Sequence, residues 1–126
     1  QYLKASEDTL YSERSRVFEN LGLTALQLGK REEAKQHFEK ALRLNSQRPT
    51  SLLQMAQLSL EDKNYVAARS YYAGFSQQAR QTPQSLLLGI RLARVFEDRD
   101  QAASLGLQLK RLYPGTPEYL QYLSEQ

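Results

Sequence analysis

The chain has 126 residues, a length that corresponds to one domain, and its 40% hydrophobic and 25% charged residues are ordinary values for a globular protein. A net charge of +3 without any block of like charge argues against a nucleic-acid-binding face, and the absence of cysteine excludes disulfides and cysteine metal ligands. No apolar run approaches the roughly 18 to 20 residues that a membrane-spanning helix needs.

Residues 1–14 are predicted to finish one element and lead into another. They begin with QYLKASEDTL, which has no signal-peptide pattern and no initiator methionine, so we expect the chain to be part of a longer protein. Residues 1–8 have the pattern of the end of a second helix from a preceding unit, with Tyr2 and Ala5 on its packing face. The segment TLYSER (9–14) is predicted as a connection, in which Ser12 caps the helix that follows.

Three successive segments, 15–48, 49–82 and 83–116, then carry paired helical patterns. Each segment contains two stretches with apolar residues at helical spacing, separated by a short turn. The residues expected on the inward faces are Phe18, Leu21, Gly22, Ala25, Ala34, Phe38, Ala41 and Leu44 in the first segment, Leu52, Met55, Ala56, Ser59, Ala68, Tyr72 and Phe75 in the second, and Leu86, Ile90, Ala93, Ala102, Leu109, Leu112 and Pro114 in the third. Residues 117–126 are predicted to start a further or capping helix.

An internal period of 34 residues links these segments. The residues that repeat at this step are Pro49, Pro83 and Pro117, then Ala34, Ala68 and Ala102, then Leu52, Leu86 and Leu120. Proline suits the first helical position, where its missing N–H has no partner to lose, and alanine lets two helices approach closely. Such a period with paired helices is typical of the tetratricopeptide repeat. We therefore predict an all-α fold, a right-handed tetratricopeptide-repeat superhelix (α-solenoid) of stacked antiparallel helix pairs that forms one domain.

The third segment departs from the pattern at two places. Ile90 occupies a position where a small residue is usual, while Gly89 comes one place early, so this helix is expected to be rotated or shifted by one residue. Gly106 replaces the aromatic residue found at Phe38 and Tyr72, which predicts looser packing around Gly106.

No pattern in the chain predicts catalysis, a cofactor or a metal site. The segment LGKR (28–31) has one glycine and no Ser or Thr after Lys30, so it is predicted as a turn between helices and not as a phosphate-binding loop. His37 is the single histidine and is assigned a surface or packing role. Glu32 and Glu33 lie near a helix N-terminus, where the helix dipole stabilises carboxylates. Tyrosines fall mainly on second helices or turns, so nucleic-acid stacking is not expected.

The sequence predicts a peptide-binding face on the first helices of the pairs, which line the concave side of such stacks. The candidate residues are Leu23, Leu26, Leu53, Gln57, Leu60, Leu87, Arg91 and Arg94. An exposed apolar stripe beside two arginines fits an extended or helical peptide with apolar anchors and an acidic group. The alternative is that these leucines pack against neighbouring repeats that lie outside this chain. Both interpretations stay open at the level of sequence.

One known use of tetratricopeptide domains is not expected in this chain. Domains that hold the C-terminal carboxylate of heat-shock chaperones use Lys and Asn at fixed first-helix positions. The equivalent positions hold Glu19, Leu23, Leu26 and Leu53, so that clamp is absent.

Two stretches, SERSRVFENLGL (12–23) and SLLLGIRLARVFEDRDQAASLGLQLKRLYPG (85–115), resemble the pilotin lipoprotein of bacterial type IV pili, and the resemblance runs along essentially the whole chain. It implies a non-enzymatic tetratricopeptide superhelix whose C-terminal part is this chain, with further repeats ahead. It also implies export, lipidation on an N-terminal cysteine, and a place at the periplasmic face of the outer membrane of a Gram-negative bacterium.

The function implied by this resemblance is to help the type IV pilus secretin reach the outer membrane and assemble into its multimer. The secretin subunit is then the expected partner, and any membrane attachment is through a lipid anchor absent from this chain, which is itself expected to be soluble. Ser12 stands where proline is expected in relatives, and no partner-binding residue can be carried over from them. The alternative is a generic tetratricopeptide peptide-binding module of another multiprotein complex.

Overall fold

The computed structural model describes the backbone of residues 2–125, together with the side chains of residue 10 and of residues 13–125. The helices are α1 (Tyr2–Gln27), α2 (Arg31–Leu44), α3 (Pro49–Glu61), α4 (Tyr65–Gln78), α5 (Pro83–Val95), α6 (Arg99–Leu112) and α7 (Pro117–Ser124). Residues 2–125 contain no strand, so the predicted all-α fold is confirmed.

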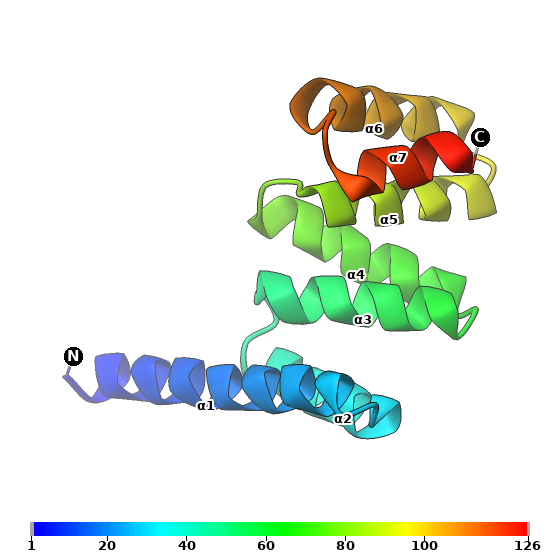
Figure 1. Ribbon diagram of the computed structural model, residues 1–126. Helices are drawn as coiled ribbons and strands as arrows, with labels where there is room; N and C mark the ends of the chain where they lie inside the picture. The colour runs from blue at the N-terminus through cyan, green and yellow to red at the C-terminus, as the bar shows by residue number, and fades with distance from the viewer. Residues whose placement is uncertain (1, 126) are drawn as a thin grey trace.

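Consecutive helices form antiparallel pairs that stack along one direction (Figure 1). The pairs are α1 with α2, α3 with α4, and α5 with α6, and each second helix also packs on the first helix of the next pair. Helix α7 lies beside α5 and against α6, as the first helix of a further pair would. Stacking in which each unit contacts its neighbours along one direction is the architecture of an α-solenoid.

The helix boundaries keep the 34-residue step through the third unit. Helices α3, α5 and α7 begin at Pro49, Pro83 and Pro117, and each proline occupies the first turn of its helix. The expected shift of α5 by one residue is therefore wrong, because its start and its end both lie 34 residues after those of α3. Gly89 has a separate role: a Cβ added there would meet the ring of Tyr72 on α4, so this glycine brings the second and third units together.

The turn inside each pair also repeats. Gly29, Lys63 and Glu97 have φ values of 76°, 64° and 56°. The amide that follows each of them donates to a carbonyl five residues back, at 2.8 Å in each case, the three pairs being Lys30 to Ala25, Asn64 to Ser59, and Asp98 to Ala93. This bonding satisfies carbonyls that a helix end would otherwise leave unpaired. The segment LGKR is thus a helix-terminating turn, as predicted.

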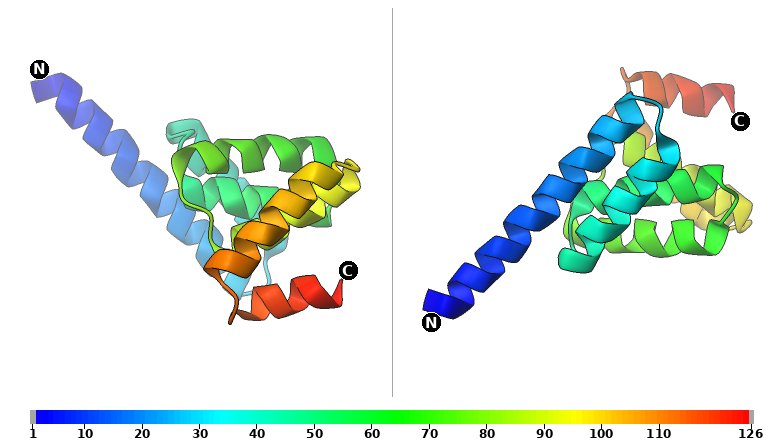
Figure 2. Two further views of the ribbon diagram at one scale, coloured as in Figure 1. Left: turned by 90° about the horizontal axis from the view of Figure 1, so that it is seen from above. Right: turned by 90° about the horizontal axis from the view of Figure 1, so that it is seen from below.

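The N-terminal helix corrects one expectation. A helix end, a connection over residues 9–14 and a new helix capped by Ser12 were expected, but α1 is one continuous helix from Tyr2 to Gln27. No glycine or proline occurs before Gly22, so nothing in this stretch ends a helix locally. The first half of α1 extends past α2, away from the other helices (Figure 2).

The two helices of each pair approach closely because a small residue faces a large one. A Cβ added at Gly22 on α1 would lie 2.7 Å from Cε1 of Phe38 on α2, and Phe38 is fully buried. The positions equivalent to Gly22 and Phe38 hold Ala56 and Tyr72 in the second pair, and Ile90 and Gly106 in the third. The large partner has changed helix in the third pair, where Ile90 packs in one cluster with Leu105 and Leu109.

The looser packing expected at Gly106 is also wrong. Gly106 is buried, and a Cβ added there would meet the phenol of Tyr122 from α7, with Cζ at 2.7 Å. A tyrosine from the next unit fills the space that the missing aromatic leaves.

Two groups of polar contacts, one around Glu19 and one around Asp62, join the first unit to the second. Glu19 on α1 is buried and accepts hydrogen bonds from the Ser51 amide at 3.1 Å, from Ser51 Oγ at 2.8 Å and from Arg48 Nε at 3.2 Å. Arg48 precedes α3 without capping it through its own side chain, so Glu19 supplies the cap from another helix. At the other end of α3, Arg31 Nη1 donates to Asp62 at 2.6 Å, and Lys35 Nζ to the same carboxylate at 2.7 Å.

Substituting Gly22→Ala is expected to lower the free energy of unfolding by about 1–3 kcal/mol, because the buried ring of Phe38 has no room to move. Urea denaturation of the two proteins measures the difference. Gly115→Ala is the matched control, since a Cβ there meets nothing within 4 Å. Equal losses for both variants would contradict the close approach of α1 and α2.

Candidate protein-binding face

The eight residues of the predicted binding face all lie on α1, α3 and α5, the first helices of the three pairs. Leu53 and Leu87 are only 9% and 8% exposed, so the expectation that they line an open groove is wrong. Leu53 belongs to a core cluster that also contains Leu88 and Leu92 of α5, which shows that it packs against the neighbouring repeat. Leu53 therefore packs on a repeat within the chain, whereas the packing alternative named repeats outside it.

The other leucines of the predicted face are half-buried at the edges of the core. Leu23 and Leu26 pack against the cluster that contains Phe38 and Met55. Leu60 packs against the cluster of the second and third units. These three side chains keep part of their surface accessible, so they remain candidates for contact with a partner.

The polar residues of the predicted face are held by carboxylates. Gln57 Nε2 donates to Glu61 Oε2 at 2.9 Å, within α3. Arg91 Nη2 lies 2.7 Å from Glu125 Oε2, and Arg94 Nη1 lies 3.5 Å from Glu125 Oε1. The structure thus brings Arg91 and Arg94 together around the Glu125 carboxylate. Gln57 does not join them, because its side chain bonds to Glu61.

The neighbours of Glu125 change the pKa of its carboxyl group. The hydrogen bond from Arg91 lowers the pKa of the Glu125 carboxyl, the hydrogen bond from Gln121 acts in the same direction, and these effects outweigh the opposing effect of burial. The sequence analysis missed Glu125, because it predicted residues 117–126 only as the start of a further or capping helix and placed no site residue there. The 34-residue step contains the signal, since Glu125, directly after α7, is equivalent to Arg91 on α5 and to Gln57 on α3.

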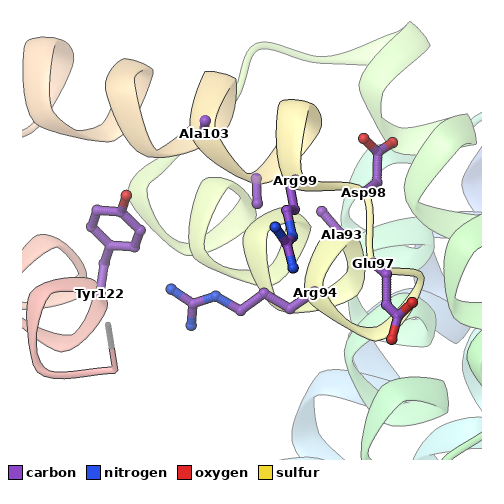
Figure 3. Close-up of a pocket in the computed structure, with 8 residues that line it drawn as sticks. Ala93, Arg94, Glu97, Asp98, Arg99, Ala103 and Tyr122 are labelled. Carbon is purple, nitrogen blue, oxygen red and sulfur yellow. The ribbon is translucent and has the colours of Figure 1, made fainter.

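Beside these arginines lies an open cavity of about 550 Å³ between α5, α6 and α7. Its lining residues are Ala93, Arg94, Glu97, Asp98, Arg99, Ala102, Ala103 and Tyr122. Figure 3 shows the Arg94 side chain extending toward Tyr122, and Arg94 Cζ lies 5.8 Å from the centre of that ring. Asp98 is already engaged, because it accepts a hydrogen bond from the Gln101 amide and caps α6. The cavity offers charged and aromatic contacts without a paired nucleophile and base.

A second cleft, of about 540 Å³, lies where α3 and α5 begin. Its walls include Pro49, Leu53, Phe75, Arg80, Pro83 and Glu118. The small exposed part of Leu53 contributes to this cleft, together with side chains from the end of α4 that sequence reasoning did not include. No local pattern identifies such residues, because they meet only when neighbouring units stack.

Neither catalysis nor metal binding gains support from the described residues. His37 stacks on Phe18 of α1, with ring centres 6.3 Å apart, which matches the packing role assigned to it. No three His, Cys, Asp or Glu side chains among the residues that the structure describes come together as metal ligands would. The chaperone-tail clamp is disfavoured as well, because Glu19 places a buried carboxylate at one of its positions.

Comparison with known proteins agrees with this architecture. Residues 15–48 match the tetratricopeptide repeat family. The chain has the fold of a tetratricopeptide-repeat solenoid. Two solved structures below 25% identity share its fold. One is PilW, a type IV pilus biogenesis factor, which has a TM-score of 0.70 and 20% identity over 84% of this chain and 49% of its own. The first tetratricopeptide domain of Spaghetti (RPAP3), bound to an HSP90 peptide, has a TM-score of 0.76 and 17% identity over 90% of both chains.

A much more similar protein is the type IV pilus assembly protein PilF of Pseudomonas aeruginosa. The chain is 61% identical to it over 123 residues, which cover 98% of this chain and 49% of PilF. A solved structure of Pseudomonas aeruginosa PilF has a TM-score of 0.89 and 60% identity, over 98% of this chain and 56% of its own. The chain is therefore homologous to part of PilF and spans about half its length. Across residues 2–125, no helix has the length and apolarity to cross a membrane.

Leu53→Asp is expected to destabilise the fold strongly. Removing the leucine alone costs about 2–5 kcal/mol, and burying an unpaired carboxylate adds to that. Val66→Asp is the control, because Val66 is 76% exposed on α4 and its replacement should leave the midpoint of thermal unfolding nearly unchanged. If Leu53→Asp stays fully helical and unfolds cooperatively at the wild-type midpoint, Leu53 is not a core residue and the open-groove interpretation is correct.

The Glu125 carboxyl is expected to titrate below its reference pKa of 4.5, and Arg91→Ala should move that pKa upward. Because the pKa is lower in the folded than in the unfolded chain, the contact contributes stability above the unfolded value and loses it as pH falls through the folded value. An NMR titration of the side-chain carboxyl measures the shift. Arg111→Ala removes an exposed arginine elsewhere and should leave the titration unchanged; equal effects of the two variants would rule out the Arg91 contact.

Proposed function

We propose that this chain is part of a pilotin-type adaptor, a non-enzymatic scaffold required for outer-membrane localisation and multimer assembly of the type IV pilus secretin. The observation that carries this proposal is the 61% identity to the type IV pilus assembly protein PilF over 98% of the chain. A tetratricopeptide solenoid suits such a role, because stacked helix pairs present extended surfaces for protein partners.

The surface of the chain supports binding rather than chemistry. Half-buried leucines, two paired arginines and two open cavities of about 550 and 540 Å³ provide apolar and charged contacts for a protein segment. In this proposal the full-length protein is held at the periplasmic face of the outer membrane through a lipid anchor outside the 126 residues, and the secretin subunit is its partner. Anchor, location and partner all belong to the proposal.

A generic peptide-binding module of another complex is the second candidate. Its support is the shared fold with the Spaghetti (RPAP3) domain, which is bound to an HSP90 peptide. A carboxylate-tail ligand of that kind is disfavoured in this chain, because a carboxyl-terminal peptide would approach Glu19, which is acidic and already satisfied by Ser51 and Arg48. The pilotin-type role is therefore the better-supported proposal.

Titration of the 126-residue chain and of the full-length protein with the purified periplasmic part of the cognate secretin tests this function. Both proteins are expected to bind, and Arg94→Glu in the chain should weaken binding if the α5 face takes part, while Val66→Asp on α4 should not. Binding by the full-length protein alone would place the contact surface outside these repeats. Absence of binding by both proteins would refute the pilotin-type proposal.

A further inference from the structure

The junction between the second and third units lacks the ion pairs that hold the first and second units together. Asp62, directly after α3, forms ion pairs with Arg31 at 2.6 Å and with Lys35 at 2.7 Å, both from α2. One period later, Phe96 takes the place of Asp62 and Arg69 that of Lys35. A single cation–π contact replaces the two ion pairs there, with Arg69 Cζ 4.6 Å from the centre of the Phe96 ring.

Smaller residues also leave the second junction less completely filled than the first. Met55 and Leu42 belong to, or pack against, the core cluster shared by the first two units. The equivalent residues at the second junction are Gly89 and Ser76. Both line a cavity of about 490 Å³ between α4, α5 and α6. The space that a methionine and a leucine fill at the first junction is thus partly open at the second.

One end of the second junction is nevertheless held firmly, by Gln81 in the segment between α4 and α5. Gln81 Oε1 accepts hydrogen bonds from Tyr72 Oη at 3.1 Å and from Ser85 Oγ at 2.7 Å. Its Nε2 donates to Ser76 Oγ at 3.0 Å, and its backbone carbonyl accepts from Tyr113 Oη at 2.9 Å. Gln81 therefore joins α4, α5 and α6 at one point, and a network in which each member has a partner is rigid.

The firm and the open contacts lie toward opposite ends of α5. Ser85, which bonds to Gln81, is in the first turn of α5. The cavity extends to Phe96, directly after the last residue of α5, and to Asp98 and Gln101 at the start of α6. A rotation of the third unit about Gln81 would therefore change the spacing mainly at the Phe96 end, where open volume is available.

We propose that the junction between the second and third units is a hinge, in which the third unit turns about Gln81 and the cavity between α4, α5 and α6 takes up the change in spacing. Sparse contacts and unfilled volume at one end of an interface permit such a motion. Leu88 and Leu92 of α5 keep the two units associated, because they share a core cluster with Phe75 of α4.

The first junction is the rigid reference within the same chain. Glu19 holds the start of α3 and the ion pairs of Asp62 hold its end, so this junction is fixed at both ends. The hinge sets the angle between α3 and α5. This inference concerns the shape of the solenoid and does not depend on the identity of any partner.

Pulsed electron paramagnetic resonance compares the two junctions directly, because the chain contains no cysteine and accepts spin labels at chosen positions. Gln36, Ser70 and Ser104 are exposed and occupy equivalent positions on α2, α4 and α6. The pair Gln36→Cys with Ser70→Cys spans the first junction, and Ser70→Cys with Ser104→Cys spans the second. The distance distribution across the second should be at least about twice as broad as across the first. Equal widths would overturn the proposal.

Filling the cavity should restrict the hinge. Ala73 is exposed and lines the cavity, and Ala73→Leu adds apolar volume there without removing a side-chain hydrogen bond. This change should narrow the distribution between Ser70 and Ser104 toward the width of the first junction. The matched control is Glu39→Leu at the equivalent exposed position on α2, which should leave that distribution unchanged. An equally broad distribution in Ala73→Leu would show that the cavity does not take up the motion, against the proposal.

Gln81→Ala tests the pivot. It should broaden the distribution across the second junction further and shift its maximum, because α4, α5 and α6 lose their common contact. The matched control is Gln47→Ala, since Gln47 is the equivalent residue of the first junction and is exposed; it should change neither distribution. An unchanged width and maximum in Gln81→Ala would refute the pivot. Circular dichroism verifies that each variant is helical, and the two label pairs without further substitution decide the proposal even if Gln81→Ala does not fold.

Discussion

Close approach of the two helices in each pair is the constraint on which the stack depends. Where Phe38 fills the space beside one helix, the facing position has to be Gly22, since even one added carbon would lie 2.7 Å from the ring. In the third pair the sizes are reversed: the large residue, Ile90, is on the first helix, and the small one, Gly106, is on the second.

Stacking of the pairs depends on contacts that cross from one unit to the next. Glu19 caps the start of α3 from within α1, and Gly89 on α5 accepts the ring of Tyr72 from α4. The same stacking buries Leu53 among residues of α5. This stacking therefore removes Leu53 from the face that was expected to bind peptides.

One repeat position is buried in the second and third units and exposed on α7. Leu52 and Leu86 are core residues because a second helix covers them, whereas Leu120 is in water because α7 has no such cover among residues 2–125. Burial in a solenoid is a property of adjacent units, so an incomplete unit exposes the residues that would form the core of a complete one.

The sequence by itself determined the elements that depend on local spacing. The 34-residue period, the helix starts at Pro49, Pro83 and Pro117, and the turn at Gly29 follow from residue types within a few positions of one another. Residues whose neighbours come from another unit were not predictable in this way. Tyr122 fills the space at Gly106, Glu125 meets Arg91, and Leu53 joins the core only when pairs stack at their actual distance and angle. Tertiary structure decided these contacts because a helical pattern shows which face is apolar, and only the stack decides what covers that face.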